Sequence, residues 1–347
     1  MDSDLNIALV GDSVLDDHFW LDNPLDDIRA QTERTLKRAY PGRSIRVHNF
    51  AVDESTIPCV LHGSAPRAQY RNGRRLAGME PYPVGEDGVV RQLDLLRKTK
   101  PTHVVLSVGG NDARARFLTS LNPDDITELM MTDGFVANLR RLVEIIRAEV
   151  TPNVIIVYVY MPQFKAFPLL HMLPPPRILR RLLVNFSKFF IEVFQAGSSI
   201  LAKCSVGPGL LCWLVCGLHP KLDLVKAAHE LERTHDSSNH ELAVEFRLPI
   251  IDLSRTFDPY NKTHYGSTPI EPSNVSGQFI ADLIVQVLAR FNFGEETAAK
   301  IFSGVGQDLK VQDLGPDARE AFSYERELQE FLDRKKADKP RSSCLVT

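Results

Sequence analysis

The chain has 347 residues, of which 44% are hydrophobic and 24% charged, and its formal net charge at pH 7 is −3. This length is enough to bury a full core, the composition is that of a soluble globular protein, and the charge gives no indication of a nucleic-acid partner. The five cysteines include no CxxC pair, which argues against a disulfide framework or a zinc site. No basic-then-apolar leader precedes Leu5, so we expect a cytoplasmic protein.

Short apolar runs rich in β-branched residues alternate along the chain with segments of helical spacing. Strands are expected at residues 6–11, 44–52, 102–110, 153–162 and 248–257. Helices are expected at residues 24–40, 87–98, 133–150 and 275–291. Continuous apolar strands separated by amphipathic helices predict a parallel sheet that is covered on both faces. We therefore predict a doubly wound α/β domain over residues 5–292.

Two segments interrupt this alternation. Residues 163–247 lie between the fourth and fifth strands and are much longer than one crossover helix requires, so we predict a large helical insertion there. Within it, the uncharged run 204–219 is too short to span a bilayer. A lid over an active site, an interfacial membrane contact and additional core stay open for this run. Residues 293–347 are predicted to form a polar tail with a surface helix at 317–339.

The C-terminal sequence "RKKADKPRSSCLVT" places Cys344 before Leu345, Val346 and Thr347, which is the C-a-a-X form with basic residues upstream. Threonine is not among the favoured last residues of that motif. Two interpretations stay open. Either Cys344 is prenylated and the basic stretch supplies the second membrane signal, or this is an unmodified cysteine.

Polar clusters follow the first three predicted strands: "GDS" (11–13), "NFAVDEST" (49–56) and "GGND" (109–112). The carboxyl ends of the strands in a doubly wound sheet lie at one edge, and ligands bind there. A serine on a strand-to-helix turn faces unpaired N–H groups that favour a developing negative charge. We therefore predict Ser13 as a nucleophile and Asn111 as a side-chain donor to the same oxyanion.

In these motifs the sequence resembles the SGNH, or GDSL-like, hydrolase superfamily. "GDS" with Ser13 resembles the nucleophile block and "GGND" with Asn111 the third block, and the likeness covers residues 5–292 without the insertion. The resemblance implies a three-layer α/β/α sandwich with a flavodoxin-like parallel sheet. It also implies an esterase or lipase that acts on a small-molecule or lipid ester without a metal or other cofactor. The substrate-binding positions would then include Asp12, Gly110 and Asp112.

Two blocks depart from the family's pattern. The second block normally has a glycine whose backbone N–H joins the oxyanion hole, but "NFAVDEST" has Glu54 there. The oxyanion hole would then consist of Ser13, Glu54 and Asn111. The last block is normally Asp-x-x-His-Pro, whereas "STPIEPSNVSG" has Thr268 and Glu271 in the aspartate and histidine positions.

The proton acceptor for Ser13 has two candidates. A solvated glutamate is a poor base, but burial of Glu271 beside Ser13 would raise its pKa toward roughly 6–7, where general-base catalysis is efficient. His264 lies in a loop that is able to fold back over the strand ends. The structural alternatives are a helix-capping carboxylate for Glu271, a solvated loop histidine for His264 and a plain N-cap for Ser13.

The function predicted on these grounds is that of a divergent serine esterase or lipase. The alternative is a catalytically inactive SGNH-fold protein that binds a ligand or a protein in the same pocket. A Rossmann-type nucleotide binder is disfavoured because "GDSVLD" lacks the GxGxxG spacing. Asp16 and Asp17 are expected at the solvated start of a helix, where acids are favoured, and not in a metal site.

Overall fold

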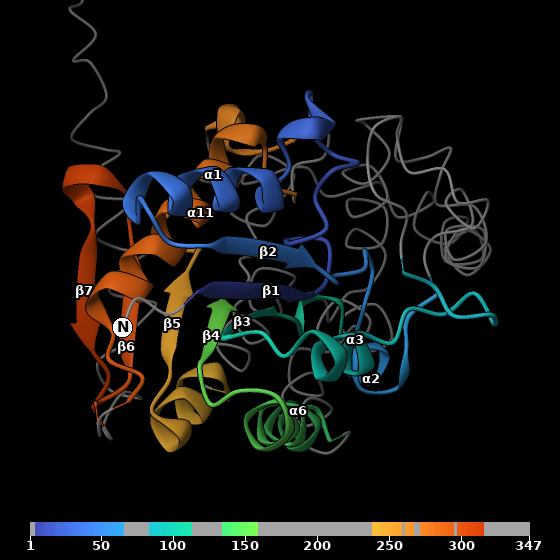
Figure 1. Ribbon diagram of the computed structural model, residues 1–347. Helices are drawn as coiled ribbons and strands as arrows, with labels where there is room; N and C mark the ends of the chain where they lie inside the picture. The colour runs from blue at the N-terminus through green and yellow to red at the C-terminus, as the bar shows by residue number, and fades with distance from the viewer. Residues whose placement is uncertain are drawn as a thin grey trace, which may run out of the picture.

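A seven-stranded sheet forms the centre of the protein (Figure 1). The computed structural model describes residues 4–65, 83–112, 134–158, 238–258, 261–266, 271–294 and 297–315. The strands are β1 (Leu5–Gly11), β2 (Ile45–Asn49), β3 (His103–Ser107), β4 (Val154–Tyr158), β5 (Pro249–Asp252), β6 (Lys300–Ser303) and β7 (Lys310–Asp313). The α-helices are α1 (Ile28–Ala39), α2 (Ile57–His62), α3 (Gln92–Thr99), α6 (Phe135–Glu149) and α11 (Asn274–Arg290). Short 3₁₀ turns are η1 (Pro24–Asp26), η4 (Lys262–His264) and η5 (Gly306–Asp308).

The strand order is β2-β1-β3-β4-β5-β6-β7, and all neighbours pair in parallel except β6 and β7. The first five strands have the flavodoxin-like order 2-1-3-4-5. The predicted doubly wound α/β fold is confirmed. Because β1 to β5 are parallel, the segments that follow them all leave the sheet at one edge.

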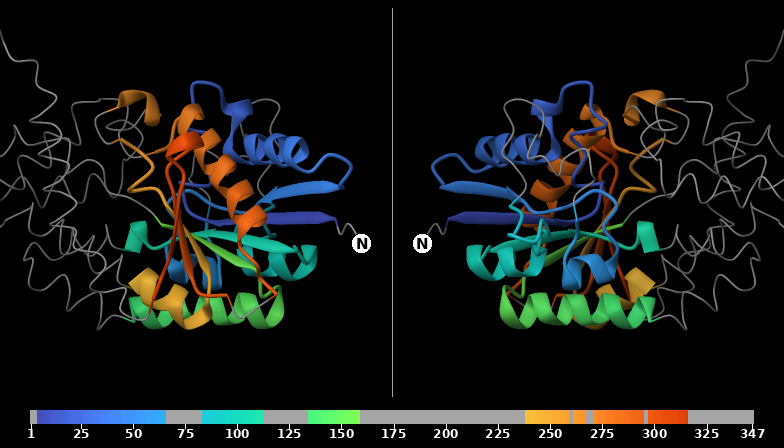
Figure 2. Two further views of the ribbon diagram at one scale, coloured as in Figure 1. Left: turned by 90° about the vertical axis from the view of Figure 1, so that its left-hand side faces the viewer. Right: turned by 90° about the vertical axis from the view of Figure 1, so that its right-hand side faces the viewer.

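Helices cover both faces of the sheet and give it two separate cores. Ile7 and Leu9 of β1 pack in the cluster that includes α1 and α11, whereas Ala8 and Val10 pack in the cluster that includes α2, α3 and α6. Figures 1 and 2 show these two groups of helices on opposite sides of the sheet. Burial on both faces explains why β1 reads as a continuous apolar run and does not alternate with polar residues.

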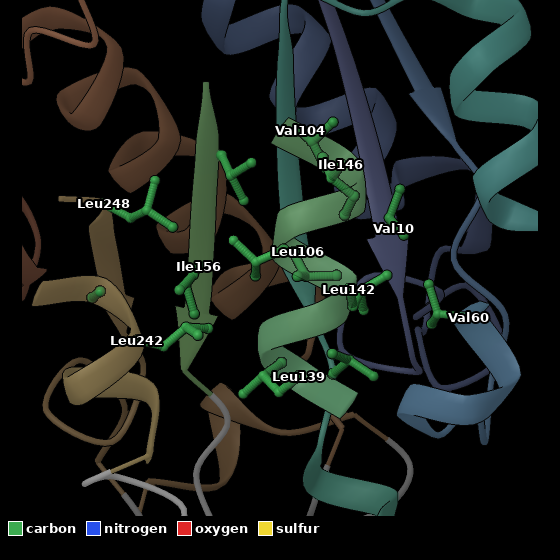
Figure 3. Packing of buried hydrophobic residues seen from close by; sticks show 14 of the residues in the cluster. Val10, Val60, Val104, Leu106, Leu139, Leu142, Ile146, Ile156, Leu242 and Leu248 are labelled. Atoms are coloured by element: carbon green, nitrogen blue, oxygen red, sulfur yellow. The ribbon is translucent and has the colours of Figure 1, made fainter. Parts of the chain in front are cut away.

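The packing of α6 shows how helical spacing builds one of these cores. Leu139, Leu142 and Ile146 lie on one side of α6 and are buried against the sheet, where Val104 and Leu106 of β3 face them (Figure 3). These positions recur every three or four residues, so they form one apolar stripe on the helix. The helix predicted at 133–150 is confirmed with bounds Phe135–Glu149.

The sheet continues beyond residue 292, where the sequence predicts only a polar tail. β6 pairs with β5, and Ile301 and Phe302 are fully buried, one in each core. β6 has only these two adjacent apolar residues among its four, which is too few to show the periodicity of a strand. The polar composition of the surrounding residues therefore predicts a tail and not a strand. The surface helix predicted at 317–339 and Cys344 lie outside the described residues.

Most of the predicted insertion, residues 163–237, also lies outside the described residues, and so does the run 204–219. The described end of the insertion is helical over residues 238–246, and Leu242 and Ala243 are buried in the core on the α6 side. Within the described part of the chain, every helix is too short or too polar to cross a membrane.

Candidate active site

The turn that follows β1 places Ser13 at the carboxyl edge of the sheet. Gly11 has φ of +129°, and a Cβ on it would overlap the carbonyl oxygen of Ser107, so only glycine fits. The N–H of Asp12 donates to that same carbonyl at 3.0 Å. Ser13 itself is 8% exposed. The chain therefore passes so close to β3 that the serine is held directly above the strand ends.

No long helix begins at this serine. The N–H groups of Leu15 and Asp16 donate to the Asp12 carbonyl, which closes a single turn, whereas α1 begins only at Ile28. The expectation that a helix N-terminus faces Ser13 is therefore wrong. Any stabilisation of negative charge here must come from the N–H groups of the turn and from neighbouring loops.

The carboxyl group of Asp12 is buried behind Ser13. Its Oδ1 accepts hydrogen bonds from the Ser107 hydroxyl at 3.1 Å and from the Val14 N–H at 3.3 Å. Burial, followed by the charge of Glu271 and to a smaller extent that of Asp112, raises the pKa of Asp12 to about 8, although these two hydrogen bonds lower it. Asp12 therefore retains its proton near neutral pH, and both other carboxylates lie close enough to influence it.

The loop after β2 contains a turn at Glu54, the position where the resemblance implies a glycine. The Ser55 N–H donates to the Val52 carbonyl at 3.0 Å, which closes a turn. Glu54 in this turn has φ of 66°, in the left-handed region that favours glycine, and its side chain is exposed. Glu54 therefore has a backbone conformation that glycine adopts at less cost.

Asn111 and Asp112 fasten the loop after β3 to the loop after β2. The Asn111 Nδ2 donates to the Ser55 carbonyl at 3.0 Å, and the Asp112 carboxylate accepts from the Ile57 N–H at 3.0 Å. Gly110 begins the short helical segment 110–112 that carries both side chains. The second N–H of the Asn111 amide has no partner among the described residues, so one hydrogen remains for an incoming oxyanion.

Glu271 lies close to the loop of residues 12–23 that follows β1, which we call the Ser13 loop. Tyr265 and Pro272 form an antiparallel bridge, and the Gly266 N–H donates to the Glu271 carbonyl at 2.9 Å. A Cβ on Gly266 would overlap the carbonyl oxygen of Trp20, so the segment beside Glu271 contacts the end of the Ser13 loop. Glu271 is 6% exposed. Thr268 lies outside the described residues.

His264 is not directed toward Ser13. Its Nδ1 accepts from the Asp258 N–H at 2.9 Å, and its Nε2 lies 3.2 Å from the Asn261 Nδ2. Phe257 and Phe279 pack against the ring, and burial lowers the pKa of His264 while Asp258 raises it. Both ring nitrogens are therefore engaged within the loop that carries them.

The Ser13 loop contains a buried acid–imidazole pair that the sequence does not reveal. Asp16 Oδ1 lies 3.0 Å from His18 Nδ1, and Asp16 Oδ2 accepts from the Asp53 N–H at 2.8 Å. Asp16, Asp17 and His18 are all at most 1% exposed. The expectation of a solvated helix start for Asp16 and Asp17 is wrong because the loop folds back over the sheet. Burial, followed by Asp27, raises the pKa of Asp17 well above its ordinary value.

The described residues contain no group of three or more His, Cys, Asp or Glu side chains arranged to hold a metal ion. The Ser13 hydroxyl also makes no hydrogen bond among these residues. The protein is thus a flavodoxin-like α/β sandwich. At the carboxyl edge of its sheet it has Ser13 after β1, the amide of Asn111 in the loop after β3, and the buried Glu271 close to the Ser13 loop.

Comparison with known proteins gives structural neighbours only. No family model and no curated protein matches the chain. An α/β hydrolase from the metagenome of Lake Arreo, Spain, is 14% identical with a TM-score of 0.45, over 84% of this chain and 98% of that one. An acetylxylan esterase from Geobacillus stearothermophilus is 13% identical with a TM-score of 0.40, over 85% and 99%. A lipase/acylhydrolase from Enterococcus faecalis is 18% identical with a TM-score of 0.39, over 84% and 99%. At these values the likeness carries no conclusion about activity.

Proposed function

We propose that this protein is a serine hydrolase that cleaves carboxylic esters, with Ser13 as the nucleophile. The observation that carries the proposal is that three loops meet at one edge of the sheet. Asn111 of the β3 loop donates to the Ser55 carbonyl of the β2 loop, and the Asp53 N–H of the β2 loop donates to Asp16 of the Ser13 loop. That arrangement offers a nucleophile and several N–H donors on loops that follow three different strands of the sheet.

In the proposed reaction, Ser13 Oγ attacks the ester carbonyl carbon and its proton passes to a base. The backbone N–H groups of Ser13 and Glu54 and the free N–H of the Asn111 amide would bind the resulting oxyanion. The base returns the proton to the departing alcohol, and water then hydrolyses the acyl-enzyme by the same route. An oxyanion donor on a backbone N–H does not depend on the side chain, so Glu54 is compatible with this role.

Glu271 is the proposed base. It is buried, it lies beside Gly266, which contacts Trp20 at the end of the Ser13 loop, and its charge acts on the buried carboxyl of Asp12 next to Ser13. His264 does not enter the proposal because both of its ring nitrogens are engaged elsewhere.

Glu271→Gln is expected to lower kcat for ester hydrolysis by roughly 10²–10⁴-fold, because the amide removes the base and keeps its size. Glu33→Gln is the matched control, since Glu33 lies on the exposed side of α1 in surface ion pairs, and it should hydrolyse at the wild-type rate. Hydrolysis of a p-nitrophenyl ester measures both. Full activity in Glu271→Gln would exclude Glu271 as the base.

A second set of variants asks whether only the base has diverged from the family pattern. Glu271→His combined with Thr268→Asp introduces an imidazole and a carboxylate able to orient it. Hydrolysis by this double variant would support the proposed site even if the wild type were slow.

Glu54→Gly is expected to preserve hydrolysis within about threefold and to raise the free energy of unfolding by up to about 1 kcal/mol, because it relieves the left-handed strain at φ of 66°. Lys100→Gly is the matched control, since Lys100 has φ of 46° at the end of α3, away from the strand edge that holds Ser13. Urea unfolding and ester hydrolysis measure the two effects. A tenfold or larger loss of rate in Glu54→Gly alone would show that the glutamate side chain is needed.

A binding protein without catalysis is the second candidate. It is favoured by the Ser13 hydroxyl, which makes no hydrogen bond to a base among the described residues. The absence of hydrolysis in the wild type and in the Glu271→His, Thr268→Asp double variant would select this candidate.

A further inference from the structure

Gln92 is a buried polar residue that has no role in the proposed reaction. It is the first residue of α3 and its side chain is 0% exposed, although a glutamine in a core helix is normally unfavourable. A buried amide is retained only when its polar atoms are hydrogen-bonded, so its partners indicate what it does.

Those partners belong to the turn that carries Ser13. The Gly11 N–H donates to Gln92 Oε1 at 2.8 Å, and Gln92 Nε2 donates to the Gly11 carbonyl at 3.1 Å. β2 ends at Asn49, opposite Leu9, and beyond it the Val52 N–H donates to the Gly11 carbonyl at 3.0 Å. The amide of Gln92 thus gives the Gly11 N–H its acceptor and shares the Gly11 carbonyl with Val52 at the last residue of β1.

The same amide reaches the loop that carries the oxyanion donors. Gln92 Nε2 also lies 3.3 Å from the Ser55 hydroxyl, which lies 2.7 Å from the Ser64 hydroxyl. The carbonyl of Ser55 accepts the hydrogen bond from Asn111. One side chain therefore joins the backbone two residues before Ser13 to the residue that orients Asn111.

We propose that Gln92 is a positioning residue that sets the distance between Ser13 and the oxyanion donors of the proposed hydrolase, on whose activity this inference rests. Displacing reacting groups by about 1 Å is enough to lower a rate by about 10²-fold. Gln92 is fully buried and so is out of reach of a substrate, and its loss should lower the rate of attack by Ser13 without weakening substrate binding.

Gln92→Met keeps the volume and removes all three hydrogen bonds. We expect it to lower kcat and the rate of Ser13 phosphonylation by an alkyl fluorophosphonate about 10- to 100-fold, with KM within about twofold of the wild type. Gln31→Met is the matched control: Gln31 is 1% exposed, and its Nε2 binds the carbonyls of Asp26 and Asn274 at 2.9 Å, away from Gly11 and Ser55. It should lose comparable stability and retain its rate.

Gln92→Glu gives a second readout that a merely structural role would not produce. Its protonated carboxyl has one donor and one acceptor and so imitates part of the amide, whereas its carboxylate has no donor for Gly11 or Ser55. The ratio of its rate to that of the wild type should fall as pH rises, at temperatures well below unfolding. A ratio independent of pH would contradict the positioning role.

The outcomes separate this inference from the proposed function. If the wild type is phosphonylated at Ser13 and Gln92→Met reacts equally fast, or slows only as much as Gln31→Met does, the inference is overturned and the hydrolase proposal stands. If the wild type is not phosphonylated at all, the proposed function fails and the positioning role fails with it.

Discussion

Ser13→Ala is expected to lower the rate of ester hydrolysis by roughly 10⁴-fold or more, to that of the uncatalysed reaction plus residual oxyanion binding. The substitution removes one oxygen atom from a turn that is fixed by backbone contacts between Gly11, Asp12 and Ser107. The Ser13 hydroxyl makes no hydrogen bond among the described residues, so stability should change little. Turnover of a p-nitrophenyl ester and urea unfolding measure the two effects.

Ser303→Ala provides the control for this substitution. Ser303 is a serine at the carboxyl end of β6, another parallel strand of the same sheet, and it is 3% exposed. It should hydrolyse the ester at the wild-type rate. Retained activity in Ser13→Ala, or equal losses in both variants, would show that the nucleophile lies elsewhere.

Replacement of Asp12 by asparagine is expected to remove a large pH dependence of stability. Burial raises the pKa of Asp12 from 3.8 to about 8, so between these values the folded protein holds a proton that the unfolded chain has released. The free energy of unfolding therefore falls as pH rises through this window, and the stabilisation present below pH 4 is lost above pH 8. Integrated over the window, the shift corresponds to about 6 kcal/mol.

The asparagine of the Asp12→Asn variant would accept the same hydrogen bonds from Ser107 and Val14 and would not ionise. The wild-type stability relative to Asp12→Asn should therefore decline steadily from pH 4 to pH 8, as measured by urea unfolding. Asp87→Asn is the control: the pKa of this exposed carboxyl is lowered to about 2 by the hydrogen bond from Arg91, so its charge is constant above pH 5. Parallel curves for Asp12→Asn and the wild type would mean that Asp12 is ionised in the folded protein.

The fold could be predicted because its strands are buried on both faces and its helices are amphipathic. β1 and β3 are continuous apolar runs because both of their faces are buried, and the polar clusters "GDS" and "GGND" mark where these strands end. β6 escaped prediction because Ile301 and Phe302 alone show no periodicity. Tertiary pairing with β5, and not local propensity, makes that segment a strand.

The candidate site could be predicted only in part. Ser13 and Asn111 follow strands directly, so sequence order places them at one edge. The role of Gln92 depends on hydrogen bonds to Gly11, 81 residues away, and no local pattern records such a contact. The Asp16–His18 pair could not be predicted, because acidic residues after a strand are normally expected to be exposed to solvent. Here the loop folds back over the sheet and buries both side chains.

Mass mapping of the wild-type protein after reaction with an alkyl fluorophosphonate tests the central claim most directly. The probe forms a stable adduct only with an activated nucleophile, and the modified peptide identifies the residue. We predict one adduct per chain, on the peptide that contains Ser13, and none in Ser13→Ala. An unlabelled wild type, or an adduct on another residue that persists in Ser13→Ala, would contradict the assignment of Ser13 as the nucleophile.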